Sequence, residues 1–321
     1  MEEIQKVHII GMGALGLLFG VPVAEYLGEQ QPVYIMDAKR RERCEKESWT
    51  INGEKVHPVM QTPQEAAGEE PADLVLVGVK YPALPSALEV MASSVGENTV
   101  ILSMMNGIDS EEILGERFGK EKVVYCVAQG MDAQRYGTAL RFTRPGRLYI
   151  GVPETPEDPA LYAQRSRRLE RVCRFFDAAA FPYIREEKIL YRLWSKFMLN
   201  VGCNQVCMVY DAPYGEALVH GSEPFAMMVG AMREVCILAQ AKGIPVGEEE
   251  VAQYIALEQT LDPGALPSMG QDRRQKRASE VEMFAGMVIR LGRELGIEVP
   301  INEFLYRRVR EIEAAYTGKH G

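Results

Sequence analysis

The sequence predicts an N-terminal α/β domain with a doubly wound, mostly parallel sheet, followed by a C-terminal domain made only of helices. Three observations predict this fold class. Strand-like and helical segments alternate through the first half, a glycine turn joins the first strand to the first helix, and strand signals end near residue 186. Together with a length of 321 residues, they predict two domains, over 1–185 and 186–321.

Short β-prone runs mark the strands of the predicted sheet. They lie at 6–10, 32–37, 73–80, 98–104, 122–129 and 181–184. Helical patterns follow the glycine turn and occupy 84–94, 109–118 and 157–178. Residues 138–153 alternate around a Pro-Gly step, which predicts a hairpin that extends the sheet. Pro22 is expected to kink or shorten the first helix, because proline offers no N–H.

The turn GMGALG at 11–16 has the glycine spacing of a Rossmann-type, dinucleotide-binding βαβ unit. We expect Gly11 to permit the tight turn, Gly13 to let a pyrophosphate approach the backbone, and Gly16 to allow close packing of helix on strand. The pyrophosphate would lie at the helix N-terminus, where unpaired N–H groups favour an anion. The candidate cofactor-binding residues of this turn are Gly11, Met12, Gly13, Ala14, Leu15 and Gly16.

Asp37, at the end of the second predicted strand, bears on the choice of cofactor. An acid at this place normally accepts hydrogen bonds from the adenosine ribose and repels a 2′-phosphate, which favours NAD(H). Lys39, Arg40 and Arg41 follow directly and could instead bind that phosphate. The residues alone leave both cofactors open.

Two further polar residues follow predicted strands, where ligands bind in open α/β sheets. Lys80 ends the run DLVLVGVK, and Asn106 lies in SMMNGID. Lys80 could equally be a solvated loop lysine. Asn106 could equally serve an Asn-Gly turn or cap a helix.

The second half is predicted to be helical. Helical patterns occupy 187–210, 223–242, 248–260, 272–295 and 302–316. Within the first of them, Lys196, Asn200 and Asn204 recur every four residues and therefore share one face of an otherwise apolar helix. Buried polar groups need partners, so this face indicates a site for a small polar ligand.

Two later residues add to this candidate site. Ser268 opens a helix, where it could either cap the helix or contact a substrate. Glu280 and Glu282 point to different faces, and we expect Glu280 to face inward because it shares a sector with Phe284.

Composition limits the class of protein. The net charge of −9 argues against a nucleic-acid partner. The six cysteines form no CxxC pair, so we expect core thiols, including Cys203 and Cys207, and no metal site. Neither a signal peptide nor an apolar run of membrane-spanning length is recognised. A reduced, cytoplasmic protein is expected.

These motifs together resemble the ketopantoate reductase (2-dehydropantoate 2-reductase) family over nearly the full chain. The shared motifs are GMGALG at 11–16, VK at 79–80, NG at 106–107, W-x-K-x-x-x-N-x-x-x-N at 194–204, S-M-x-x-D at 268–272, Glu280, and GIEVPIN at 296–302. The resemblance implies a Rossmann domain followed by a helical domain like the C-terminal domain of 6-phosphogluconate dehydrogenase. It also implies NADP(H) as cofactor and is compatible with a homodimer.

The resemblance further implies roles for the candidate residues. Lys196 would be the general acid, and Asn200, Asn204, Ser268 and Glu280 would hold the substrate. Lys80 and Asn106 would correspond to the lysine and asparagine of the cofactor-binding half, with Asn106 also near the substrate.

The expected reaction is reduction of ketopantoate to (R)-pantoate, a step of pantothenate biosynthesis, by hydride from NAD(P)H to C2. Lys196 would protonate the developing alkoxide, and Glu280 would orient Lys196 and receive a substrate hydroxyl. Asn200 and Asn204 would bind the hydroxyl or carbonyl group, and Ser268 the carboxylate.

The sequence departs from the family where Asp37-Ala38 replaces the arginine that commonly follows the second strand. An NADH-dependent D-2-hydroxyacid dehydrogenase of the same fold, acting on other branched or aromatic 2-oxo acids, is therefore a first alternative. A non-catalytic dinucleotide-binding sensor is a second.

Overall fold

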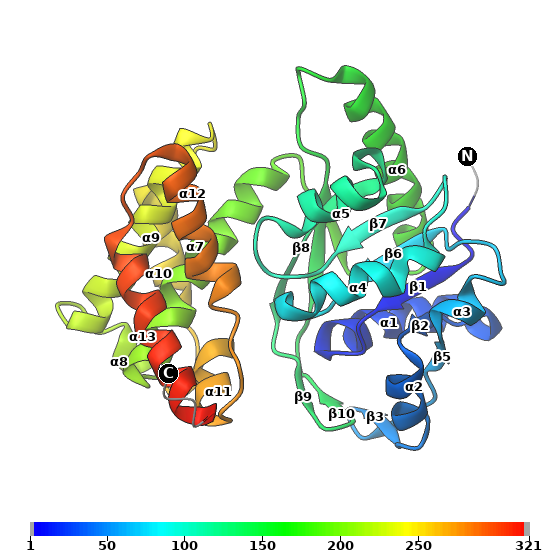
Figure 1. The fold of residues 1–321 in the computed structure, drawn as a ribbon, viewed down its shortest axis with the longest axis horizontal. Coiled ribbons are helices and arrows are strands. Elements are labelled where there is room, and N and C mark those ends of the chain that lie inside the picture. The colour runs from blue at the N-terminus through cyan, green and yellow to red at the C-terminus, as the bar shows by residue number, and fades with distance from the viewer. Residues whose placement is uncertain (1–2, 318–321) are drawn as a thin grey trace. The chain divides into compact units, whose positions relative to one another are not determined.

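The computed structural model describes residues 3–317, and its chain divides into two compact units, Met1–Ile189 and Leu190–Gly321 (Figure 1). The sequence placed the boundary between residues 185 and 186. The first unit contains a mostly parallel sheet with helices, and the described part of the second contains helices and loops but no strand.

The main sheet of the first unit has the strand order β12-β11-β8-β7-β6-β1-β2-β5 within the described residues. Its strands are β1 (Val7–Ile10), β2 (Val33–Ile35), β5 (Val59–Gln61), β6 (Leu74–Val77), β7 (Val100–Ser103), β8 (Val123–Met131), β11 (Pro145–Gly151) and β12 (Tyr183–Arg185). Strand β1 pairs in parallel with both β2 and β6, so the chain order reverses beside β1. Such a switch point is where doubly wound sheets bind ligands.

Helices cover both faces of this sheet. Leu74 and Leu76 face helices α1 (Ala14–Leu27) and α6 (Pro159–Ala178) in one core, and Val75 and Val77 lie in the opposite core. The helices of that opposite core are α3 (Pro63–Ala66), α4 (Leu84–Met91) and α5 (Ser110–Phe118). Burial on both faces explains why the strands appear as continuous apolar runs rather than alternating ones. The predicted doubly wound fold is confirmed.

Helix α1 continues through Pro22 to Leu27, so of the two expected effects shortening is wrong, and a kink stays a prediction. Proline removes one N–H from the helix, but Leu17, Leu18, Phe19 and Val23 of the same helix are buried in the core. Packing of this face maintains the helix despite the missing hydrogen bond.

The hairpin predicted for 138–153 is also wrong. Its two halves belong to different sheets, because β11 pairs with β8, whereas β10 (Ala139–Arg141) belongs to a second sheet. That sheet has the order β4-β3-β10-β9 within the described residues and includes β3 (Trp49–Ile51), β4 (Glu54–Val56) and β9 (Gln134–Tyr136). Asp132, between β8 and β9, accepts hydrogen bonds from the N–H groups of Thr143 and Arg144, between β10 and β11. The Pro-Gly step therefore lies at the start of β11 and not at the turn of a hairpin.

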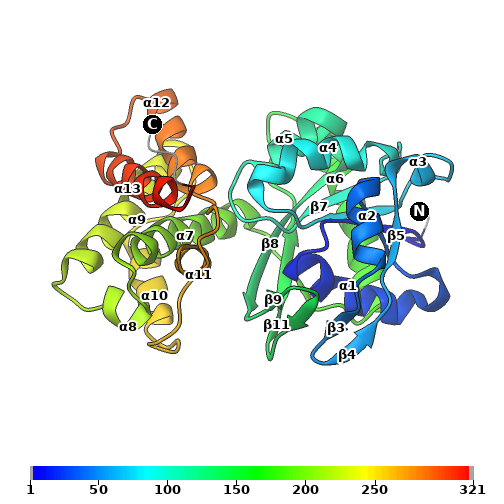
Figure 2. The same cartoon turned by 60° about the horizontal axis from the view of Figure 1, so that its bottom comes forward.

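The second unit is built from helices α7 (Ile189–Tyr210), α8 (Tyr214–Ala217), α9 (Glu223–Ala241), α10 (Glu248–Glu258), α11 (Ser268–Arg274), α12 (Met287–Leu295) and α13 (Pro300–Thr317), with a π-helical turn at Glu282–Gly286 (Figure 2). Helices α7 and α9 approach closely at Gly202, where a Cβ would lie 2.6 Å from Cγ of Met232. Glu234 of α9 accepts hydrogen bonds from the N–H groups of Ile301 and Asn302, at the start of α13. None of the helices in residues 3–317 is both long and apolar enough to cross a membrane.

The helix predicted over 272–295 is interrupted. Helix α11 ends at Arg274, and Lys276 adopts a left-handed conformation with φ of 51°. Ser279 then donates from its N–H and its hydroxyl group to Oε1 of Glu313, both at 2.7 Å. These contacts with α13 hold residues 275–281 out of a helical path, which the local sequence pattern did not reveal.

A buried carboxyl group near the N-terminus of α5 predicts a pH dependence of stability. Glu111 is 1% exposed, and its Oε2 accepts a hydrogen bond from Ser110 Oγ at 2.9 Å. Burial raises the pKa of Glu111 from 4.5 to about 7, and the nearby charge of Asp109 acts in the same direction. The hydrogen bonds from Ser110 and from backbone N–H groups oppose this shift.

We expect Glu111→Gln to stabilise the protein at pH 8 but not near pH 4.5. The folded state retains the proton to higher pH than the unfolded state, so the contribution of Glu111 to the free energy of unfolding falls as the pH rises from 4.5 to about 7. The expected gain at pH 8 is on the order of 3 kcal/mol. Thermal melting at both pH values measures it, and an equal effect at the two pH values would contradict the assignment.

Candidate active site

The glycine turn brings three main-chain segments into close contact. Gly11 follows β1 with φ of 105°, and a Cβ there would lie 2.6 Å from the carbonyl oxygen of Gly78, which follows β6. A Cβ on Gly16 would lie 2.0 Å from the carbonyl oxygen of Gly11. The predicted roles of Gly11 in the tight turn and of Gly16 in close packing are confirmed.

Gly13 differs from its two neighbours. A Cβ there would meet only the carbonyl oxygen of Gly78, at an ordinary contact distance of 3.6 Å, and φ is −87°. The fold itself therefore does not require glycine at this position. Gly13 precedes α1, and no side chain caps this helix, so the first N–H groups lie at an open helix N-terminus. This arrangement fits the pyrophosphate of a dinucleotide.

The other residues of the turn lie beside this opening. Met12 is buried, and Ala14 and Leu15 are half-buried. The carbonyl oxygen of Met12 accepts a hydrogen bond from Nη1 of Arg135 at 2.7 Å. The sequence analysis missed Arg135, because no local pattern connects residue 135 with the glycine turn.

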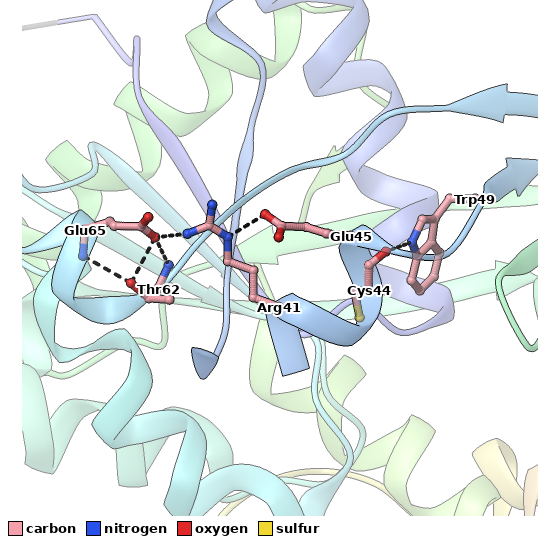
Figure 3. A network of polar contacts seen from close by, with 6 residues as sticks. All are labelled: Arg41, Cys44, Glu45, Trp49, Thr62 and Glu65. Carbon is pink, nitrogen blue, oxygen red and sulfur yellow. Dashed lines mark hydrogen bonds and ion pairs between the residues drawn. The ribbon is translucent and has the colours of Figure 1, made fainter. Parts of the chain in front are cut away.

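Asp37 caps helix α2 (Ala38–Glu45), with Oδ1 accepting a hydrogen bond from the N–H of Arg40 at 2.9 Å. Arg41 is held by two carboxylates, Glu45 of its own helix and Glu65 of α3 (Figure 3). Glu65 also forms a capping box with Thr62. Of the three basic residues that follow Asp37, Arg41 is thus already engaged in ion pairs.

Lys80 and Asn106 belong to the same edge of the main sheet as the glycine turn. Exposed Lys80 follows β6 and half-buried Asn106 follows β7, and both strands are parallel to β1. The predicted position of these residues beyond the strand ends is confirmed. Their contact with a cofactor stays a prediction.

Lys196, Asn200 and Asn204 occupy successive turns of α7, as the spacing predicted. Lys196 and Asn200 are half-buried, and Asn204 is 6% exposed. Oδ1 of Asn204 accepts hydrogen bonds from Ser268 Oγ at 2.7 Å and from the N–H of Met269 at 3.2 Å. Nδ2 of Asn204 donates to Oδ1 of Asn200 at 3.3 Å. These residues form a connected chain from α11 to α7.

Ser268 does not cap its helix. It is the first residue of α11, the N-cap position is occupied by Pro267, and the Ser268 hydroxyl donates to Asn204. Of the two roles that the sequence left open, capping is therefore wrong, and contact with a substrate remains a prediction.

Glu280 faces inward, as predicted, with 9% of the residue exposed. Glu282 is exposed and accepts a hydrogen bond from the hydroxyl of Tyr306 at 2.6 Å. The contact between Ser279 and Glu313 fixes the segment that carries Glu280. A π-helical turn follows, a feature that is frequent near functional sites.

The thiols of Cys203 and Cys207 on α7 are buried. Sγ of Cys203 lies 3.6 Å from Oε2 of Glu258, which is also buried. Burial raises the pKa of this carboxyl group. Across residues 3–317, no group of three or more His, Cys, Asp or Glu side chains is placed to hold a metal ion.

Comparisons with known proteins agree with this arrangement. Residues 7–155 match the family "Ketopantoate reductase PanE/ApbA", and residues 188–313 match its C-terminal domain. A 2-dehydropantoate 2-reductase of Streptococcus pyogenes serotype M3 is 24% identical over 317 residues, covering 96% of this chain and 98% of that protein.

Two solved structures share the fold. A PanE/ApbA family ketopantoate reductase from Ralstonia eutropha JMP134 has 25% identity and a TM-score of 0.79, with 97% of this chain and 99% of that chain covered. A D-mandelate dehydrogenase with NADH and anilino(oxo)acetate has 21% identity and a TM-score of 0.81, with the same coverage. The matches to both domains show that the chain belongs to the ketopantoate reductase family of NAD(P)-dependent oxidoreductases.

Proposed function

We propose that the enzyme reduces 2-dehydropantoate to (R)-pantoate. The observation that carries this proposal is the chain of hydrogen bonds from Ser268 through Asn204 to Asn200, on the helix face that also bears Lys196. A cation and oriented amides along one helix face suit a small, polar 2-oxo acid. The relative in Streptococcus pyogenes, named a 2-dehydropantoate 2-reductase, supports the choice of substrate.

The cofactor would lie in the glycine turn, with its pyrophosphate at the N-terminus of α1 and beside Gly13. When bound, the reduced nicotinamide supplies the hydride that the carbonyl carbon of the substrate accepts. Lys80 and Asn106, beyond the ends of β6 and β7, would contact the cofactor from the same sheet edge, and Asn106 would also approach the substrate.

The direction of the hydrogen bonds assigns donors and acceptors to the substrate-binding residues. The N–H of Met269 can only donate, so the atom of Asn204 that faces it must be oxygen. The amide nitrogen of Asn204 then faces Asn200, which must present its own oxygen in return. This leaves the amide N–H groups of Asn200 to donate to a substrate oxygen.

The same argument changes the role that was expected for Ser268. A hydroxyl has one proton, and that of Ser268 is directed at Asn204. Ser268 can therefore accept a hydrogen bond from the substrate but cannot also donate to a carboxylate. We propose that a hydroxyl group of the substrate donates a hydrogen bond to Ser268. A substrate oxygen would accept a hydrogen bond from the amide of Asn200.

Lys196 would be the proton donor, because an ammonium group both polarises a ketone and neutralises the alkoxide that forms from it. Glu280 would orient Lys196 and accept a hydrogen bond from a substrate hydroxyl. Its burial favours this role, since a buried carboxylate is a strong acceptor. A homodimer, which the family resemblance allows, stays a prediction.

One observation favours a second candidate function. Asp37 follows β2 at the place where an acid favours NADH, so the enzyme could be an NADH-dependent D-2-hydroxyacid dehydrogenase for other branched or aromatic 2-oxo acids. Such substrates lack the 4-hydroxyl group of 2-dehydropantoate.

Initial rates separate the two candidates. We expect kcat/KM to be highest for 2-dehydropantoate, compared with 2-oxoisovalerate and benzoylformate, with NADPH and NADH measured in parallel. The reason is that Glu280 and Ser268 accept hydrogen bonds from hydroxyl groups. A preference for benzoylformate with NADH would favour the second candidate, and cofactor binding without turnover of any 2-oxo acid would indicate a sensor.

Removal of the proposed proton donor should affect the chemical step. We expect Lys196→Met to lower kcat by about 10²- to 10⁴-fold while cofactor binding remains. Lys242→Met, at the exposed C-terminus of α9, is the matched control and should retain activity. Near-normal turnover of the Lys196 variant would refute the assignment.

The glycine turn gives a paired test of cofactor binding. We expect Gly13→Ala to fold normally but to bind NAD(P)H at least about tenfold more weakly, because the new methyl group occupies the approach of the pyrophosphate. Gly16→Ala should instead destabilise the protein by about 1–3 kcal/mol, because its Cβ clashes with main-chain atoms. Thermal melting and fluorescence titration distinguish the two effects; unchanged affinity in Gly13→Ala would count against the proposed cofactor position.

A further inference from the structure

We propose that Glu313 is a positioning residue for Glu280, through which helix α13 sets the preference of the enzyme for a 2-oxo acid with a 4-hydroxyl group. The inference rests on the proposed function, in which Glu280 accepts a hydrogen bond from that hydroxyl group. Glu313 would not contact the substrate itself. It would act through the segment that carries Glu280, at residues 275–281.

Glu280 lies in a part of the chain that no regular helix supports from its N-terminal side. Helix α11 ends at Arg274, and Lys276 has a left-handed backbone with φ of 51°. Helical hydrogen bonding resumes at Glu280, whose carbonyl oxygen accepts hydrogen bonds from the N–H groups of Met283 and Phe284 at 3.0 and 3.2 Å. The position of Glu280 therefore depends on how the residues just before it are held.

Ser279, directly before Glu280, is held by Glu313. Oε1 of Glu313 accepts hydrogen bonds from both the N–H and the hydroxyl group of Ser279, each at 2.7 Å. The oxygen of that hydroxyl accepts a hydrogen bond from the N–H of Val281 at 3.3 Å. The residues before and after Glu280 are thereby joined to each other, and Ser279 is joined to α13. Ser279 is 7% exposed, so water would not readily replace the carboxylate if Glu313 were removed.

Arg310 fixes the orientation of the Glu313 carboxylate. Its Nη1 donates to Oε2 of Glu313 at 3.2 Å, from one turn earlier on α13. Only 13% of the Glu313 side chain is exposed. Because each oxygen of the carboxylate has its own partner, Oε1 faces Ser279 in one defined direction.

Tyr306 offers a matched control on the same helix. Its hydroxyl donates to Oε1 of Glu282 at 2.6 Å, and Glu282 is an exposed residue of the π-helical turn. This contact also joins α13 to the chain beside Glu280, but it does not involve Ser279. Tyr306→Phe therefore removes one hydrogen bond between these two parts of the chain and leaves the contact between Ser279 and Glu313 in place.

The choice of substrate separates the positioning of Glu280 from general support of the fold. 2-Dehydropantoate has a 4-hydroxyl group, whereas 2-oxoisovalerate lacks it. A displaced Glu280 would lose its hydrogen bond to that hydroxyl, which affects only the first substrate. An effect on Lys196 or on the fold would affect both substrates alike. The ratio of the two kcat/KM values therefore reports the position of the Glu280 carboxylate.

The test measures this ratio, 2-dehydropantoate over 2-oxoisovalerate, for the full-length enzyme with a saturating concentration of the cofactor it prefers. We expect Glu313→Ala to lower the ratio at least about tenfold, because a hydrogen bond to a charged group contributes about this much. Ser279→Ala should lower it about threefold or more, since the N–H of residue 279 can still bind Glu313.

Two further variants and one double variant show whether Glu313 acts through Glu280. Glu313→Gln should keep the ratio within about threefold of the unaltered enzyme, because its amide oxygen can still accept both hydrogen bonds from Ser279. Tyr306→Phe should leave the ratio unchanged. In an enzyme that already carries Glu280→Ala, adding Glu313→Ala should not lower the ratio further, because the residue through which it acts is gone.

An equal fall of kcat/KM for both substrates in Glu313→Ala would overturn the proposal, because it would limit Glu313 to supporting the fold. If Glu313→Ala does not fold, Ser279→Ala decides, and an unchanged ratio in that variant would also overturn it. The same holds if Tyr306→Phe lowers the ratio as much as Glu313→Ala does. Each of these results leaves the proposed reductase function intact, whereas an unaltered enzyme without a preference for 2-dehydropantoate would overturn both proposals.

Discussion

The N-terminal unit depends on contacts between main chains that only glycine allows. A side chain on Gly16 would collide with the backbone of Gly11, and one on Gly11 would collide with that of Gly78. These glycines let β1, β6 and the start of α1 meet at one point of the sheet. An uncapped helix N-terminus is thereby placed at the switch point of the strand order, where doubly wound sheets bind ligands.

In the C-terminal unit, by contrast, hydrogen bonds between side chains and the backbone set the orientation of the polar groups. The N–H of Met269 determines the orientation of the Asn204 amide, and Asn204 in turn determines that of Asn200. A half-buried amide with a defined orientation offers donors in one direction only. The segment that carries Glu280 is likewise held by the contact between Ser279 and Glu313. Both sets of contacts orient polar groups without a ligand, so the substrate binding that we propose for these residues would cost less ordering entropy.

Much of the fold followed from local patterns. The strands buried on both faces were recognisable as apolar runs, and α7 and α9 as long helical patterns. The second sheet was not recognisable, because its strands are short and the pairing of β3 with β10 joins segments that are far apart in the chain. The interruption after Arg274 was missed for a related reason, since Glu313 of α13 acts on Ser279 from a distant position.

The sequence by itself determined the βαβ unit with its glycine turn, the helical character of the second half, and the common face of Lys196, Asn200 and Asn204. These features depend on residue spacing within one element, which the periods of strand and helix translate directly into structure. Only the tertiary structure decided that Arg41 is engaged by Glu45 and Glu65, that Arg135 reaches Met12, and that Ser268 donates to Asn204. Most of these contacts join residues that are remote in sequence, and the direction of a hydrogen bond depends on which partner the completed fold brings within reach.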